Sequence, residues 1–262
     1  MNLNQLINEV NNMYFETSSS YRVVSSKARE LLELLGASTN IKDITREKIL
    51  IYFNHLKQLG NKATTINSKM CYLSKLLTYA FDNRLIDYKP TIPYIKVKDN
   101  NKKKFLTPDE YSLMLEYAYS NNLTELYYAL TIGYNTGIRI SNILALSPEV
   151  IDNGYIRVWE NKTNKPYSVP MNDTLKLILA DFKGFTLNYR QIQYQFTNMI
   201  KALQLDTAIT LHTLRHTTCS RLVEKGIALP VIQALMNHKN LSTTMLYTHL
   251  SNKQLEDAVK EL

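Results

Sequence analysis

Cysteine is nearly absent from this 262-residue chain, which contains only Cys71 and Cys219. The two lie far apart, each among helix-forming residues, so the sequence offers neither a disulfide framework nor a paired-cysteine metal site. The chain also lacks an apolar run long enough to span a membrane, and its first residues lack the basic start and apolar centre of a signal peptide. These absences predict a soluble protein of the reducing cytoplasm that contacts no membrane.

Acidic residues are also few: 23 Asp and Glu stand against 31 Lys and Arg, which gives a formal net charge of +8. Residues 1–98 are the more basic part, with 14 Lys and Arg against 8 Asp and Glu. A basic surface favours a polyanionic partner such as nucleic acid, although a modest excess of lysine can also serve solubility alone. With a hydrophobic content of 45%, 262 residues are enough for two folded domains.

The first part of the chain reads as helical. Apolar residues recur at spacings of three and four over ARELLELLG and TREKILIYFNHLKQLG, which end in Gly36 and Gly60, the residue type favoured after a helix. A third helix is predicted over TTINSKMCYLSKLLTYAFDNRLID, with an apolar stripe of Ile66, Met70, Leu73, Leu77 and Ala80 or Phe81. Its opposite side either faces solvent or enters a DNA groove; it carries Asn67, Lys69 and Lys75.

A break follows in KPTIPYIKVKDNNKKKFLTPDE, which has no helical period before Thr107. There Thr107, Pro108 and Glu110 predict a helix start with a capping box. We therefore expect an N-terminal helical domain over residues 1–97, a basic linker over 98–104 and a second domain over 105–262. The linker lysines either keep the linker solvated or neutralise the phosphates of a duplex. The candidate DNA contacts therefore come from the third helix and from the linker: Thr64, Lys69, Lys75, Lys102, Lys103 and Lys104.

The second domain is predicted to be mostly helical, with one β-hairpin in GYIRVWENKTNKPYSVPM. Its strands are expected around Tyr155–Trp159 and Ser168–Met171. Helices are expected at roughly 172–182, 188–203, 212–225, 229–236 and 242–250, followed by a last amphipathic helix at about 252–262. The predicted fold class is thus mainly α, with two domains: an N-terminal helical bundle and a C-terminal mixed, mostly helical domain with a small antiparallel β-hairpin.

The stretch HTLRH, His212 to His216, places two imidazoles and a guanidinium in one predicted helix. It could be a zinc pair, a phosphate-binding Arg215 with an acid–base His212, or ordinary helix surface. The spacing of His212 and His216 suits zinc, but no H-E-x-x-H glutamate and no third ligand follow. Other basic or nucleophilic residues lie in NTGIRISNILAL, on the hairpin turn, in LMNHKNLSTT and in MLYTHL; they are Arg139, Lys162, His238 and Tyr247. Singly, each could be ordinary surface.

Taken in order, these segments closely resemble the tyrosine recombinases, the family of phage integrases and Xer-type recombinases. TGIRIS resembles the family's first arginine motif, HTLRH its H-x-x-R motif, and MNHKNLSTTMLYTH the motif in which a histidine precedes a tyrosine by nine residues. The first half resembles the family's DNA-clamping domain in SSSYRVVSSKARELLELL and KATTINSKMCYLSKLLTYAFDNRLID. The resemblance covers nearly the whole chain.

The resemblance implies a site-specific DNA recombinase that uses no metal, no ATP and no cofactor. Tyr247 would attack the scissile phosphate and form a 3′-phosphotyrosyl enzyme, and a 5′-hydroxyl of a second duplex would then reseal the strand. Arg139 and Arg215 would bind the non-bridging oxygens and stabilise the charge of the phosphorane.

For the proton transfers, the resemblance assigns acid–base work to His212, protonation of the leaving 5′ oxygen to Lys162 and a hydrogen bond to the phosphate to His238. Lys165 competes with Lys162, which is preferred as the first lysine of the turn. Two positions depart from the family pattern. Asn142 replaces a common acidic residue and cannot support an imidazolium by charge, and Asn237 replaces a common glycine but tolerates the left-handed conformation.

The resemblance further implies a monomer that clamps one DNA half-site and a homotetramer on paired inverted half-sites. The tetramer would be linked through the C-terminal helix, with its apolar stripe of Leu255, Val259 and Leu262. Two alternatives stay open. One is a type IB topoisomerase-like or hairpin-resolving enzyme, which shares the tyrosine and phosphate chemistry. The other is a catalytically silent DNA-binding protein.

Overall fold

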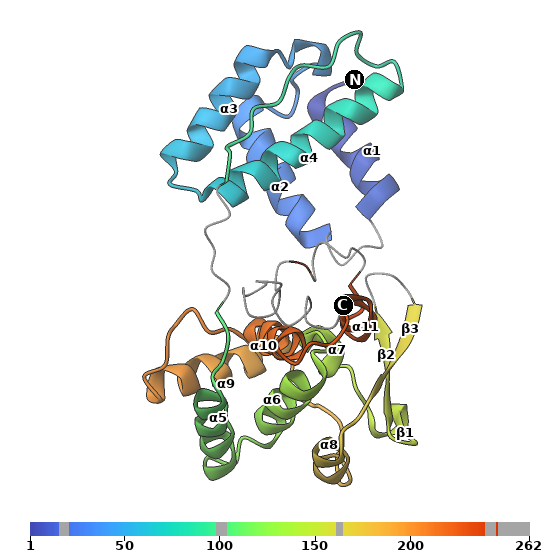
Figure 1. Ribbon diagram of the computed structural model, residues 1–262. Coiled ribbons are helices and arrows are strands. Elements are labelled where there is room, and N and C mark those ends of the chain that lie inside the picture. The colour runs from blue at the N-terminus through green and yellow to red at the C-terminus, as the bar shows by residue number, and fades with distance from the viewer. Residues whose placement is uncertain (16–20, 98–103, 161–164, 239–244, 246–262) are drawn as a thin grey trace, which may run out of the picture. The chain divides into compact units, whose positions relative to one another are not determined.

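The structure, a computed structural model, describes residues 1–15, 21–97, 104–160, 165–238 and 245. It divides into two compact units, Met1–Asn100 and Asn101–Leu262. The first is built of helices and the second of helices around a three-stranded antiparallel sheet (Figure 1). The fold class expected from the sequence is therefore confirmed. Over the described ranges, no helix is both long enough and apolar enough to cross a membrane.

The first unit contains helices α1 (Leu3–Phe15), α2 (Tyr21–Leu35), α3 (Arg46–Gln58) and α4 (Ala63–Asp82), and a short 3₁₀ turn at Ile41–Asp43. Their apolar faces form one core. The predicted stripe of α4 is buried in full, and Ala80 completes it because Phe81 is 45% exposed. Helix α1 was not predicted from the sequence. It buries Leu3, Leu6 and Val10, and the hydroxyl of Tyr72 donates to its Asn11.

The polar side of α4 is largely engaged within its own unit. Asn67 donates to the carbonyl of Ile95 and accepts from its N–H, both at 2.8 Å, and so fixes the segment that leaves the unit. The Nζ atom of Lys69 lies 2.6 Å from a carboxylate oxygen of Glu30. The Nζ atom of Lys75 lies over the rings of two aromatic residues, Tyr14 and Phe15. For Asn67 the structure shows a role that the sequence alternatives, solvent or DNA groove, did not include.

The second unit begins with α5 (Pro108–Ser120), where the predicted capping box of Thr107 and Glu110 is confirmed. Then follow α6 (Thr124–Thr136), α7 (Ile140–Ile143), a 3₁₀ turn (Pro148–Val150), and strands β1 (Ile151–Asp152), β2 (Tyr155–Glu160) and β3 (Lys165–Pro170). The chain continues through α8 (Asp173–Ile178), α9 (Tyr189–Ala202), α10 (Leu211–Glu224) and α11 (Leu229–Leu235).

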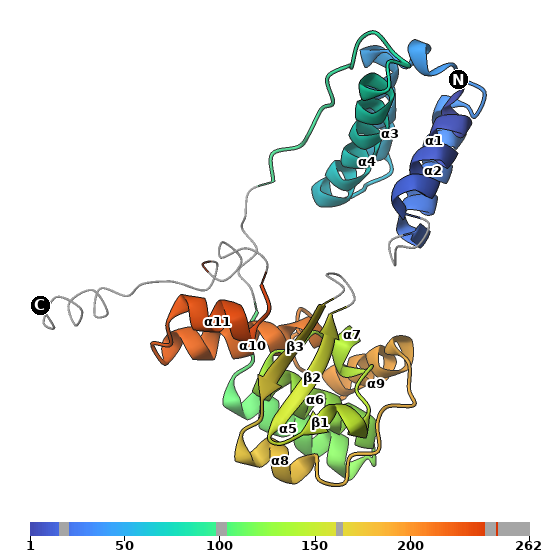
Figure 2. The same ribbon diagram turned by 90° about the vertical axis from the view of Figure 1, so that its right-hand side faces the viewer.

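Helix α6 is the centre of this unit. One side packs against α5, α9 and α10 through a core that includes Leu130, Phe196 and Leu214. The other side packs against the sheet and α8 through a core that includes Ile132, Val158 and Leu175. Figure 2 shows the sheet lying across α6. The segment Gly137–Arg139 follows directly from this buried helix.

The sheet has the order β1-β2-β3, and its register pairs Glu160 with Lys165. The predicted second strand, Ser168–Met171, is therefore wrong in its start, because β3 begins at Lys165. Pro166 opposes Trp159 within the strand. An edge strand tolerates proline because one side of it needs no N–H donor. The predicted helix at 172–182 is shorter than expected and ends at Ile178.

Candidate active site

Arg215 joins three segments that are far apart in the sequence. It lies on α10, is 4% exposed, and its Nη1 donates to the carbonyl of Gly137 at 2.7 Å. Its Nη2 donates to the carbonyl of Met236, at the end of α11. Gly137 precedes Arg139 by two residues and Met236 precedes His238 by two. A single guanidinium thus holds together the three motifs that the sequence singled out.

Glycine is favoured at position 137, where α6 ends beside Met236. It ends α6 with a left-handed φ of 68°, and a Cβ atom there would lie 2.5 Å from the terminal carbon of Met236. Glycine adopts this conformation without strain and leaves room for the Met236 side chain. The two residues whose carbonyls accept from Arg215 therefore also pack against each other.

Arg139 caps the start of α7 with extended backbone and has a partly exposed side chain. Its Nη1 donates to Oε2 of Glu160, the last residue of β2, whose own side chain is 4% exposed. Sequence reasoning did not identify Glu160. The sequence did contain a signal for its burial: Ile156, Val158 and Glu160 occupy every second position, so all three face the buried side of the strand. A charged residue on such a face needs a partner.

Asn142 and Tyr167 lie beside this ion pair. Asn142 is 3% exposed, and its buried side-chain amide neighbours the buried Tyr167 hydroxyl. Burial raises the pKa of the Tyr167 hydroxyl, whereas the neighbouring Asn142 amide and the charge of Arg215 lower it in part. The charges of Glu160 and Arg139 also act on this hydroxyl. These five residues form the polar centre of the unit: the guanidinium groups of Arg139 and Arg215, the carboxylate of Glu160, and the neutral side chains of Asn142 and Tyr167.

The histidines lie in two of the segments that Arg215 joins, α10 and the residues after α11. His212 is exposed in the first turn of α10, and its ring contacts that of half-buried His216 edge to face, with centroids 4.7 Å apart. His238 is half-buried and follows Asn237, which adopts the predicted left-handed conformation with φ of 47°. The backbone of His238 is tied in both directions to Gln233. Among the described residues, no three His, Cys, Asp or Glu side chains form a group that could hold a metal ion.

The remaining candidates divide by whether the structure describes them. Four of them, Lys162, Tyr247, Lys102 and Lys103, lie outside the described residues. Lys165 is exposed and opposes Glu160 across the strands. Lys104 is held by carboxylates of its own unit, with its Nζ atom 3.3 Å from Asp206 and 4.0 Å from Glu110. Thr64 is exposed at the start of α4.

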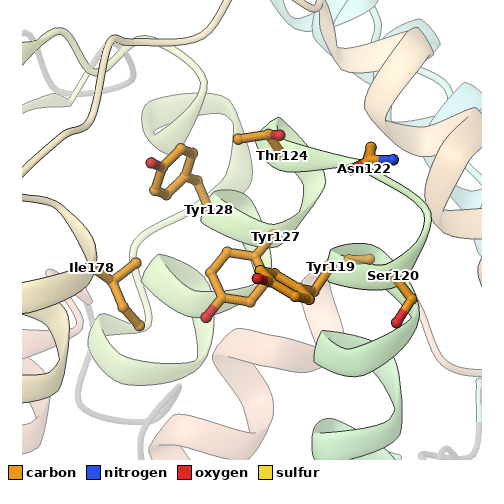
Figure 3. A pocket seen from close by; sticks show the side chains of 8 residues that line it. Tyr119, Ser120, Asn122, Thr124, Tyr127, Tyr128 and Ile178 are labelled. Atoms are coloured by element: carbon orange, nitrogen blue, oxygen red, sulfur yellow. The ribbon is translucent and has the colours of Figure 1, made fainter.

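A separate cavity of about 520 Å³ lies among α5, α6 and α8 (Figure 3). Phenol rings dominate its lining, with Tyr119, Tyr127 and Tyr128, and no carboxylate, imidazole or amine contributes to it. It opens beside the first turn of α6, whereas Arg139 follows the last turn, and 13 residues of helix span roughly 20 Å. The cavity is therefore remote from the two arginines and lacks the groups for acid–base chemistry.

Comparison with known proteins places the chain in a family. A model described as the phage integrase family matches residues 104–182 and 176–254, and one described as the phage integrase SAM-like domain matches residues 2–98. The tyrosine recombinase XerD of Halalkalibacterium halodurans is 26% identical over 243 residues, covering 82% of this chain and 81% of that protein. The tyrosine recombinase XerC of Listeria monocytogenes is 26% identical across 93% of this chain and 92% of that protein.

Solved structures share the fold. The Tn1549 transposon integrase in complex with a circular intermediate DNA aligns over 100% of both chains, with a TM-score of 0.84 at 19% identity. A lambda integrase tetramer bound to a Holliday junction aligns over 93% of this chain and 77% of that chain, with a TM-score of 0.74 at 22% identity. The chain belongs to the phage integrase family, the tyrosine recombinases, and is a site-specific DNA recombinase.

Proposed function

We propose that this recombinase cuts and rejoins DNA strands through a 3′-phosphotyrosyl intermediate on Tyr247 and a Holliday junction, without metal or ATP. The observation that carries the proposal is the pair of hydrogen bonds from Arg215 to the carbonyls of Gly137 and Met236. These bonds bring the segments of Arg139, Arg215 and His238 to one place. One phosphate can then meet donors from all three.

The two arginines provide the positive charge that phosphoryl transfer needs. Guanidinium groups offer paired N–H donors that match the non-bridging oxygens of a phosphate and the charge that grows on them in the transition state. Arg139 is the more accessible of the two, with 29% of its side chain exposed. We assign it the first contact with the phosphate and assign Arg215 the rigid, buried contact.

Strand cleavage then consists of one bond formed and one bond broken. The Tyr247 oxygen bonds to phosphorus, its proton passes to His212, and the 5′ oxygen departs with a proton from Lys162. His238 donates a hydrogen bond to the phosphate. Because the phosphotyrosyl ester keeps a phosphoester bond, a 5′-hydroxyl of the second duplex can attack it and release the tyrosine without an energy source.

We further propose that the enzyme acts as a homotetramer on two duplexes that carry paired inverted half-sites, and that the free protein is a monomer. The lambda integrase tetramer on a Holliday junction, which shares the fold, supports this arrangement. The basic character of residues 1–98 supports a role of the first unit in gripping the duplex. Thr64 and Lys102–Lys104 remain candidate DNA contacts, together with Lys69 and Lys75 if DNA draws them from their partners.

A suicide substrate, a half-site duplex with a nick that lets the cleaved end escape, tests the proposal. Wild-type protein should form a covalent adduct in the presence of EDTA, whereas Tyr247→Phe should bind the duplex equally well and form none, because only the attacking oxygen is lost. Tyr194→Phe is the matched control, since Tyr194 is 69% exposed on α9, and it should react normally. An adduct on Tyr247→Phe, or its loss from the wild type in EDTA, would contradict the mechanism.

The reaction products distinguish the recombinase from the two alternative functions. A topoisomerase-like or hairpin-resolving enzyme forms the same adduct but exchanges no partners. Two intact target sites incubated with the recombinase should instead yield four-way junctions, detectable on native gels. A catalytically silent DNA-binding protein would give neither adduct nor junction.

A further inference from the structure

Glu160, the last residue of β2, has a buried carboxylate that contacts Arg139. The residue is 3% exposed and lies on the same face of the strand as Ile156 and Val158. Its Oε2 accepts from Nη1 of Arg139, which belongs to a different element, the start of α7. The strand fixes the carboxylate, so the carboxylate in turn restricts the guanidinium.

Glu160 supplies negative charge beside the two arginines, whereas the neighbouring side chain of Asn142 is neutral. Asn142, also on α7, contributes an amide to the same centre. The charged groups that act on the Tyr167 hydroxyl are Arg215, Glu160 and Arg139, and Glu160 is the acidic one among them. Burying a carboxylate is costly unless a cation and hydrogen bonds compensate it. A carboxylate on an otherwise apolar strand face is therefore better explained by its contact with Arg139 than by packing.

We propose that Glu160 is a positioning residue for strand cleavage: its carboxylate holds the Arg139 guanidinium in the orientation that receives the scissile phosphate. The proposal rests on the proposed function. Arg139 has five N–H donors, and its partly exposed side chain leaves some of them to the DNA while Glu160 binds from the protein side. A rigidly oriented donor stabilises the transition state without being reorganised during the reaction.

The test compares Glu160→Gln and Glu160→Ala with a matched control, Asp152→Asn. Asp152 also pairs with an arginine of the sheet, Arg157, but this pair is exposed on both sides. Three quantities are measured: the single-turnover rate of adduct formation on the suicide substrate at saturating protein, the affinity for the same duplex, and the melting temperature.

We expect Glu160→Gln to lower the cleavage rate about tenfold, because its amide oxygen still accepts from Arg139 without the charge, and Glu160→Ala about a hundredfold. DNA affinity should change by less than about threefold, because the contact with the phosphate is retained. Asp152→Asn should match the wild type in all three measurements. A cleavage rate about ten times higher for Glu160→Gln than for Glu160→Ala distinguishes orientation of Arg139 from simple loss of packing.

Two results would overturn the proposal. A Glu160→Gln rate equal to or above that of the wild type would mean that the carboxylate does nothing for Arg139 or competes with the phosphate. Parallel losses of affinity and rate would make Glu160 a determinant of DNA binding. If Glu160→Ala fails to fold, the isosteric Glu160→Gln decides alone. A wild-type protein that forms no adduct would instead refute the proposed function, and this proposal with it.

Discussion

Arg215 and Arg139 differ in what the folded protein already does with their donors. Arg215 is buried and donates hydrogen bonds to the carbonyls of Gly137 and Met236, so it stabilises the fold as well as the site. Arg139 is partly exposed and anchored by Glu160. The loss of either arginine should slow cleavage by orders of magnitude, but Arg215 should carry an additional cost in stability.

We therefore predict that Arg215→Ala lowers the free energy of unfolding by about 2–4 kcal/mol, because it leaves two buried carbonyls without a donor. Arg157→Ala is the control: Arg157 pairs with Asp152 on the surface, and its loss should cost less than about 0.5 kcal/mol. Thermal unfolding of both variants measures this difference. Equal melting temperatures would show that the hydrogen bonds of Arg215 add nothing to stability.

The choice of general acid between Lys162 and Lys165 is also a single-residue question. A bridging 5′-phosphorothiolate needs little protonation when it leaves, so it should restore cleavage to the variant that lacks the acid. We predict rescue of Lys162→Ala and little effect on Lys165→Ala, whose lysine lies in β3 opposite Glu160. The measurement is the rate of adduct formation on the two substrates, and rescue of Lys165→Ala alone would reverse the assignment.

At the level of elements, the end of α6 and the end of α11 form one junction. We predict that Gly137→Ala lowers the free energy of unfolding by about 1–3 kcal/mol, from its positive φ and from contact with Met236. Gly226→Ala is the matched control, because Gly226 has a φ of 72° but nothing within 4 Å of its Cβ position. Because both glycines have a positive φ, the difference between the two melting temperatures measures the cost of the contact between the new methyl group and Met236. Of these two variants, only Gly137→Ala should slow cleavage, because Gly137, unlike Gly226, accepts a hydrogen bond from Arg215.

Elements with strong local signals were predicted well. The capping box of Thr107 and the apolar stripe that ends at Ala80 are set by neighbouring residues, so a sequence reveals them. Helix α1 was missed because its four asparagines have low helix propensity, and burial of its apolar side against the core compensates for them. The start of β3 was missed because the polar residues before Ser168 were assigned to the turn, whereas the structure pairs Lys165 and Pro166 with β2 at the sheet edge.

For the candidate site, the sequence predicted the motifs and their order, but it did not predict the contacts between them. Resemblance supplied Arg139, Arg215 and His238, each within a recognisable local segment. The ion pair with Glu160 depends on how β2 meets α7, and the hydrogen bonds of Arg215 cross 78 and 21 residues of chain. Such contacts arise only after the helices and the sheet pack, so local sequence cannot specify them.

At the scale of the whole molecule, the C-terminal segment NKQLEDAVKEL carries a narrow apolar stripe of Leu255, Val259 and Leu262. This segment lies outside the described residues, so the expectation rests on the sequence. A helix this short is not stable alone and must dock, either on its own domain or on a neighbouring subunit. Burying three such side chains contributes on the order of 4–6 kcal/mol before ordering costs, which is enough to matter to a cyclic assembly.

We predict that deleting residues 253–262 leaves a folded monomer, because the residues that the structure describes already form core clusters in both units, between Leu3 and Met236. The truncated protein should still bind one half-site in a gel-shift assay. It should lose cooperative binding to paired sites and cleave them weakly or without control, because each active site loses its link to the next. A truncated protein that assembles and recombines normally, or that unfolds at low temperature, would show that this segment docks within its own subunit or not at all.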